Sequence, residues 1–250
     1  MKKALKNTTK LLIFLYGVDL NAKGVAHYTH VHRLFPYLSA SGRRSLVSYL
    51  KNKKYILVED FDDTKQLFIT SHGIEYIHNQ FPALSSRYDD WDRTWSMLVF
   101  IEGPQSDPHF RYLRQLLLET YAGQLSRGVY LYPKQFHTRV SEQFQYYRGC
   151  ISITTIKSWD FGDERSIIVP LFQLHDIKDS LSGVSKEVDF LLANFNDQKR
   201  TMLRREDELG LAFDRLCAML AFDVGIHKAY FPQVERLKEI LPRLCSLYLL

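Results

Sequence analysis

One short stretch of the chain combines basic and hydroxyl-bearing side chains at spacings suited to recognition of a polyanion. Its polar members are Arg43, Arg44, Ser45, Ser48 and Lys51. Guanidinium and ammonium groups bind phosphate oxygens, guanidinium groups also read base edges, and hydroxyls donate to either. The aliphatic residues between them recur three and four positions apart, which predicts a helix over residues 42–53 with an inward apolar side. The pattern therefore predicts a helix that presents a basic face to a nucleic acid.

The positive charge of the chain is concentrated near its N-terminus. Residues 1–54 contain eleven Lys and Arg residues and one acidic residue, Asp19, which gives a net charge of +10. The whole chain carries +5, so residues 55–250 carry a net charge of −5. A concentrated excess of positive charge favours a polyanionic partner, although lysines spread over a solvated surface would give the same count.

Two carboxylates are candidates for metal-dependent phosphodiester hydrolysis, which needs acidic side chains fixed around a divalent ion. Glu102 and Asp107 both follow the strand predicted for residues 95–101. Asp107 immediately precedes Pro108, a position typical of a helix N-cap, and Glu102 alone would hold a metal ion poorly. We therefore expect no catalytic residue and no metal site, and we expect that the chain is not an enzyme.

Histidines and cysteines give no stronger indication of a metal centre. On one helix His27 and His30 would share a face and His32 would not, so only two ligands would be available to a metal ion. We interpret the three histidines instead as polar residues of a packed or DNA-facing helix. No phosphate-binding or dinucleotide-binding glycine motif occurs, and we expect no cofactor. The cysteines form no C-x-x-C pair and suit a reducing compartment; they are Cys150, Cys217 and Cys245.

The elements that would position the basic helix follow in a regular order along residues 1–82. Apolar periodicity predicts three helices, a hairpin and a fourth helix, at residues 11–16, 26–35, 42–53, 55–69 and 70–77. Ser41 is the expected N-cap of the basic helix. This order is typical of a winged helix-turn-helix domain, which places one helix in the major groove and would bring Lys53, Lys54 and Lys65 near phosphates. Such a domain could instead pack against protein.

The rest of the chain divides into a central and a C-terminal block. In the central block, the apolar pattern predicts the order strand, helix, strand, helix, strand, strand, and the last strand lies at residues 167–169. This order suggests a small ferredoxin-like α/β sandwich. Apolar residues at helical spacing predict a helical C-terminal block. The expected fold class is α+β, with a winged helix-turn-helix, a ferredoxin-like sandwich and a helical domain at residues 1–82, 90–174 and 175–250.

Aromatic residues of the central block allow two interpretations. They could wall a ligand pocket, or they could fill the core and a domain interface. The residues concerned are Trp91, Trp95, Trp159, Tyr130 and Tyr132.

Several motifs of the first two blocks occur together in one known family. Residues 88–95 read Y-D-D-W-D-R-T-W and lead into a tryptophan-led strand with Leu98-Val-Phe100. Arg111 and Leu113-Arg114 lie on the next helix, and residues 125–133 read L-S-R-G-V-Y-L-Y-P. Together with residues 44–56 and Thr70-x-x-Gly73, this combination resembles the PaaX-type repressors of the phenylacetate pathway. The resemblance covers about residues 8–172 and is weaker in the C-terminal block.

The resemblance implies a cytoplasmic transcriptional repressor that binds double-stranded DNA as a homodimer and is released by a small-molecule effector, an acyl-CoA by family analogy only. The family's middle domain is similar to small CRISPR-associated ferredoxin-like nucleases, so a metal-dependent nuclease is the alternative function. Ile101 stands where such a nuclease would place an acidic residue, which puts nuclease activity in doubt. Tyr49 stands where the family's recognition helix usually has a second Arg, so the operator sequence is open.

The apolar segments of the chain are short. None approaches the ~20 residues of a membrane span, so we expect no membrane partner. The lysines that precede residues 11–18 imitate a signal peptide, but the apolar run has only eight residues. A cytoplasmic location is therefore expected.

Overall fold

The computed structural model describes residues 5–21, 24–62, 64–102, 107–160, 162–195 and 202–250, without the side chains of residues 202–205. The fold is α+β, as predicted, with helices and two antiparallel sheets. The chain forms two compact units, which are described separately. Unit 1 contains residues 1–86, 177–228 and 232–250, and unit 2 contains residues 87–176 and 229–231. The charges of Lys2, Lys3 and Lys23 lie outside the described residues.

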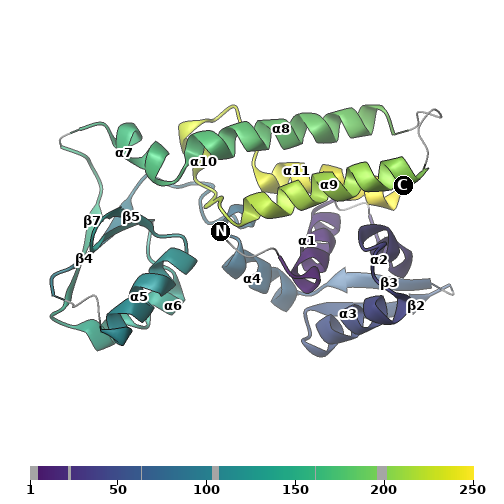
Figure 1. The fold of residues 1–250 in the computed structure, drawn as a ribbon, viewed down its shortest axis with the longest axis horizontal. Coiled ribbons are helices and arrows are strands. Elements are labelled where there is room, and N and C mark those ends of the chain that lie inside the picture. Colours follow the sequence, from purple (N-terminus) through teal and green to yellow (C-terminus); the bar gives the residue numbers. More distant parts are fainter. Residues whose placement is uncertain (1–4, 22–23, 63, 103–106, 161, 196–201) are drawn as a thin grey trace. The chain divides into compact units, whose positions relative to one another are not determined.

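The N-terminal part of unit 1 consists of helices around a small sheet (Figure 1). The sheet has the order β1-β3-β2 and is antiparallel throughout. The hairpin predicted from the sequence is confirmed, but its strands are longer than expected, and the two-residue strand β1 carries no sequence signal. The elements are α1 (Asn7–Leu20), β1 (Ala26–His27), α2 (Tyr28–Leu34), α3 (Ala40–Asn52), β2 (Ile56–Phe61), β3 (Thr64–Ile69) and α4 (Ser71–Gln80).

Helix α1 is buried on almost every side. Residues 11–15 are at most 2% exposed, because the run L-L-I-F-L offers no polar face to solvent. Helix α1 contacts α3, α4 and β3 of the N-terminal part, and it packs along α11 (Leu237–Leu249) from the other end of the chain. At the crossing with α11, a Cβ on Gly17 would lie 2.5 Å from Sγ of Cys245. The two helices therefore approach as closely as a glycine allows.

The C-terminal block is helical, as the apolar periodicity predicts. Its helices are α8 (Leu174–Ala193), α9 (Met202–Leu220), α10 (His227–Tyr230) and α11. The rings of Phe14, Phe213 and Tyr248 join α1, α9 and α11, with centroids 5.6–6.5 Å apart. Most of residues 1–82 and most of residues 175–250 lie in the same compact unit. In the described residues, no helix is long and apolar enough to cross a membrane.

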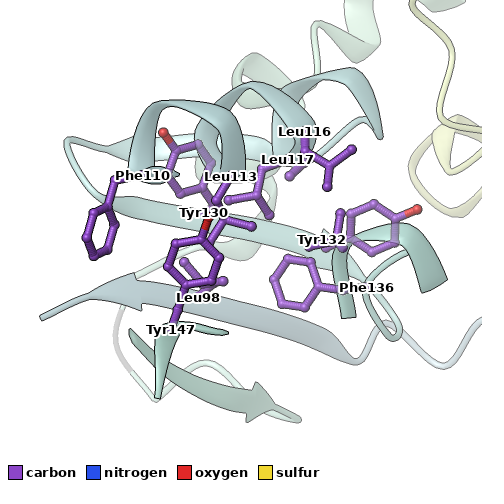
Figure 2. Close-up of a cluster of buried hydrophobic side chains, with 11 residues drawn as sticks. Leu98, Phe110, Leu113, Leu116, Leu117, Tyr130, Tyr132, Phe136 and Tyr147 are labelled. Atoms are coloured by element: carbon purple, nitrogen blue, oxygen red, sulfur yellow. The ribbon is translucent and has the colours of Figure 1, made fainter. Parts of the chain in front are cut away.

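Unit 2 is built on a four-stranded antiparallel sheet of order β5-β6-β4-β7. Its core lies between the sheet and α5, whose leucines face Leu98 and the rings of Tyr130 and Tyr132 (Figure 2). Trp95 is also buried, but it points to the sheet face opposite Leu98 and stacks there on Phe172. Tyr130, Tyr132 and Trp95 are therefore packed inside unit 2. The elements are β4 (Trp95–Phe100), α5 (Pro108–Glu119), β5 (Gly123–Ser126), β6 (Val129–Pro133), α6 (Thr138–Ser141), the 3₁₀ turn η2 (Phe144–Tyr147) and β7 (Ile151–Ile156).

The predicted strand order of the central block is wrong in two places. Strand β5 was missed because it is an edge strand with one buried residue, so it lacks an apolar alternation. Residues 167–169 are not a strand but part of α7 (Glu164–Leu171), which Asp163 caps by accepting the backbone N–H of Arg165 at 3.0 Å. The observed order is β-α-β-β-α-β, the order of the ferredoxin-like motif.

The α1–α11 contact gives a first prediction. Gly17→Ala should lower the free energy of unfolding by about 1–2 kcal/mol, because overpacking against Cys245 and Leu241 outweighs the better helix propensity of alanine. Chemical denaturation measures the change. The matched control is Gly183→Ala on α8, where a Cβ would have no atom within 4 Å, and it should raise stability by up to ~1 kcal/mol. Equal responses of the two variants would contradict the proposed close approach.

Candidate nucleic-acid interface

Helix α3 separates its apolar and polar residues, as its sequence predicts. Leu46, Val47 and Leu50 are buried, whereas the predicted ligand-binding residues on the other side of the helix are exposed. Arg44, Ser48 and Lys51 are spaced by four and three residues, so they lie along one face. The exposed predicted residues of α3 are Arg44, Ser45, Ser48 and Lys51.

Arg43 is placed differently from its neighbours on α3. It is only partly exposed, and its Nη1 donates to the backbone carbonyl oxygens of Phe35, at 3.3 Å, and Leu38. These carbonyls belong to the turn between α2 and α3, so the Arg43 guanidinium fixes the angle at which α3 leaves that turn. The sequence pattern could not reveal this role, because it depends on where the preceding turn folds back.

The N-terminus of α3 is capped by Ser39 rather than by Ser41. The Oγ of Ser39 accepts the backbone N–H of Gly42 at 3.1 Å, and the helix begins at Ala40. The prediction of Ser41 as the cap was wrong by two residues because both serines precede the same apolar pattern. Ser41 is instead exposed, as is Asn52 at the far end of the helix, so both extend the polar face beyond the residues predicted from the sequence.

The C-terminus of α3 is locked to the start of α4. The backbone N–H of Tyr55 donates to Leu50 at 3.1 Å, and Lys54 adopts a left-handed conformation with φ +59°. The Oγ1 of Thr70 donates to the carbonyl of Lys54 at 2.7 Å and accepts the N–H of Gly73 at 3.0 Å. Because both ends of α3 are held in this way, its polar face has a defined orientation within unit 1. Lys53 and Lys54 are exposed at this end.

The hairpin of β2 and β3 follows α3 along the chain. It carries Lys65, the last of the residues predicted to contact DNA. Lys65 is exposed and lies opposite Asp60 in the antiparallel pair, with 3.3 Å between Nζ and Oδ1. This ion pair is at the surface, where such pairs contribute little to stability. Lys65 therefore remains accessible to solvent beside an acidic neighbour, which the sequence pattern did not take into account.

The histidines of the N-terminal part form a packed helix start. Nδ1 of His30 accepts the backbone N–H of His27 at 3.0 Å, so that nitrogen must be unprotonated in this arrangement. His30 is buried, and burial, followed by repulsion from His27 and Arg33, lowers its pKa from 6.5 to about 4. His32 is exposed on another side of α2. These positions agree with the interpretation of the histidines as residues of a packed helix.

Glu102 and Asp107, the two carboxylates considered as metal ligands, have different surroundings. Oδ1 of Asp107 accepts the backbone N–H of His109 at 2.8 Å and caps α5, as predicted. Glu102 is exposed after β4, and the Gly103 and Pro104 that follow it lie outside the described residues. Among the residues that the structure describes, no three His, Cys, Asp or Glu side chains gather where they could hold a metal ion.

Together, these features define an α+β chain with a solvent-facing basic helix and an adjacent hairpin in one unit. Residues 88–168 match the family model of the PaaX protein central Cas2-like domain, so the resemblance to the PaaX-type family is confirmed for the central block. A solved structure of an uncharacterized protein, Rv0674 from Mycobacterium tuberculosis, is similar over 94% of this chain and 97% of that chain, with 14% identity and a TM-score of 0.45. None of the curated proteins compared matches the chain.

The buried His30 predicts a dependence of stability on pH. Its folded pKa lies below that of the unfolded chain, so the unfolded state binds more protons at acidic pH. The stability that neutral His30 provides is complete above about pH 6.5 and is lost as the pH falls towards 4. His30→Gln keeps an acceptor for His27 but cannot titrate, so it should remove a pH-dependent loss on the order of 2 kcal/mol. Urea denaturation at pH 7 and pH 4.5 compares the two proteins, and identical pH profiles would contradict this role.

The left-handed Lys54 predicts a stabilising substitution. Lys54→Gly should raise the free energy of unfolding by about 0.5–1 kcal/mol, because glycine adopts φ +59° without the steric cost of a Cβ. The control Lys53→Gly removes the same charge at a residue with φ −76°, where a Cβ causes no steric strain. This variant should therefore not raise the free energy of unfolding. Thermal denaturation of both variants tests the difference. If both respond alike, charge rather than backbone conformation controls the effect.

Proposed function

We propose that the protein is a transcriptional regulator that binds double-stranded DNA through the exposed face of α3. The PaaX central domain at residues 88–168 supports a regulator in general terms. The more specific proposal rests on one observation: Arg44, Ser48 and Lys51 are exposed along one face of α3, and residues 39–54 contain no acidic residue. A helix with this composition suits the major groove, which admits one helix and offers acceptors to arginine and lysine.

The arrangement around α3 supports a winged helix-turn-helix assignment. Helices α2 and α3 are joined by the turn that Arg43 fixes, and the β2–β3 hairpin follows α3 directly. In this assignment α3 is the recognition helix and the hairpin is the wing. Contact with protein instead of DNA would not require a face that lacks acidic residues, and the net charge of +10 on residues 1–54 favours a polyanion.

The proposed contacts divide into two kinds. Arg44, Ser45, Ser48 and Lys51 face the groove, and Lys53, Lys54 and Lys65 contact phosphates at the end of α3 and on the hairpin. Arg43 is assigned to orient α3, because its Nη1 is engaged by the carbonyls of Phe35 and Leu38. We expect that loss of Arg43 weakens binding through disorder of the turn rather than through a lost base contact.

The proposal extends to the assembly and its control by analogy with PaaX-type proteins. The regulator acts as a cytoplasmic repressor and binds two half-sites as a homodimer. A small-molecule effector releases it. Among the described residues, no specific observation favours the alternative of a metal-dependent nuclease. Asp107 caps a helix, and Glu102 is exposed, so the two do not form a metal site.

The DNA-binding proposal predicts the behaviour of Arg44→Ala/Lys51→Ala. Fluorescence anisotropy with duplex DNA from the promoter of its own operon, or from selection of bound sequences, should show at least about tenfold weaker binding at ~0.1 M salt. The slope of log affinity against log salt should become shallower by about one unit for each lost phosphate contact. Circular dichroism verifies that the variant is folded.

A variant with the same change in charge elsewhere serves as the control. Arg127 in the β5–β6 turn and Lys186 on α8 are both exposed, so Arg127→Ala/Lys186→Ala removes one arginine and one lysine without touching α3. This control should bind DNA like the unchanged protein. Undiminished affinity of the α3 variant, or an equal loss in the control, would show that α3 is not the DNA-reading helix.

A further inference from the structure

Unit 2 contains a polar cavity that has no part in the proposed DNA contact. Its volume is about 550 Å³, which is within the range of small-molecule sites. The lining residues come from the segment before β4, from the strands β4 and β7, and from the turn after β6. Those used below are Arg87, Asp92, Ser96, Lys134, Thr155 and Lys157.

One residue of the cavity lining is mostly buried and carries a hydroxyl without a partner among the described residues. Ser96 on β4 is only 8% exposed, yet within the described part of the chain its hydroxyl makes no hydrogen bond. It lies directly opposite Thr155 of the neighbouring strand β7, so the two side chains project from the same face of the sheet. The hydroxyl oxygen itself is not closed off from the cavity, so it is available to donate a hydrogen bond to a ligand there.

The walls of the cavity hold two cations in fixed positions. Lys134 has a left-handed backbone with φ +58°, its backbone N–H donates to Thr94 at 3.0 Å, and its Nζ donates to the carbonyl of Arg87 at 2.8 Å. Arg87 in turn donates from Nη2 to the carbonyl of Gln135. These contacts join two segments of the wall, and they position positive charge before any ligand arrives, which lowers the entropic cost of binding.

A third cation lies beside the hydroxyls. Lys157 follows β7 and is exposed, and in the described residues its ammonium group makes no ion pair or hydrogen bond. One of the two acidic residues of the lining is already engaged, because Oδ1 of Asp92 accepts both the backbone N–H of Thr94, at 3.0 Å, and its hydroxyl, at 2.7 Å. The other, Asp90, is exposed. The cavity therefore carries more positive than negative charge and has hydroxyl donors in its lining.

We propose that this cavity binds a small phosphorylated molecule. The phosphate group accepts hydrogen bonds from Ser96 and Thr155 and is neutralised by Lys157 and Lys134. Phosphate suits the site better than a carboxylate, because its additional oxygens and greater charge use several donors at once. The carboxylates of Asp90 and Asp92 then lie among the lining residues as acceptors for hydroxyl groups on the rest of the ligand.

Direct binding to the full chain, without DNA, tests the site independently of the proposed regulator function. Isothermal titration with glycerol 3-phosphate should show saturable binding, and inorganic phosphate should compete for it. Thr155→Val/Lys157→Ala should weaken the binding at least about tenfold. Ser96→Ala should weaken it as well, because it removes the lining hydroxyl without adding volume.

The sheet itself provides the matched control. Thr154 is exposed and adjacent to Thr155 but points to the opposite face of β7, so Thr154→Val/Lys186→Ala should bind glycerol 3-phosphate like the unchanged protein. Absence of saturable binding, or equal binding by the cavity variant and the control, would overturn the proposal. Equally tight binding of glycerol or acetate would refute the assignment of phosphate. Competition by a short DNA duplex but not by phosphate would assign the cavity to nucleic acid instead.

Discussion

The structure of unit 1 depends on the enclosure of one helix that has no polar side. The residues of α1 from Leu11 to Leu15 are all buried, and no single layer of structure could cover them. The N-terminal sheet and helices cover one part of the surface, and α11 from the far end of the chain covers the rest. Gly17 permits this second contact because any side chain there would meet Cys245. The two ends of the chain must consequently fold as one unit.

The same enclosure leaves α3 with a defined open face. Leu46, Val47 and Leu50 are its buried residues, Gly42 and Arg43 are partly exposed, and its other residues face solvent. The bonds from Arg43 and Thr70 then hold the two ends of the helix. The basic face is thus a consequence of packing and capping, and contacts within the chain fix it, which reduces the ordering that DNA binding would require.

Local patterns in the sequence were sufficient for most helices, for the β2–β3 hairpin and for the open face of α3, because helical periodicity separates Arg44 and Lys51 from the aliphatic residues. They were insufficient wherever a cap, a turn contact or a contact with a distant segment decides the outcome. Ile168 and Val169 suit a strand or a helix, and the cap at Asp163 selects the helix. The union of the chain ends has no local signal at all, since it depends on the match between Gly17 and α11. Arg43 likewise differs from Arg44 only through the turn that it contacts.

The two proposed sites differ in ways that follow from their geometry. The cations of α3 are exposed and spaced along a helix, so they can contact an extended polyanion at several points but cannot enclose a small one. The cations of the unit 2 cavity line the same volume as the hydroxyl of Ser96, and Lys134 is held by the carbonyl of Arg87. Such a concave arrangement, with several donors converging on one volume, suits a compact anion better than an extended one. Sequence could not have indicated this cavity, because Ser96 and Thr155 meet only through the pairing of β4 with β7.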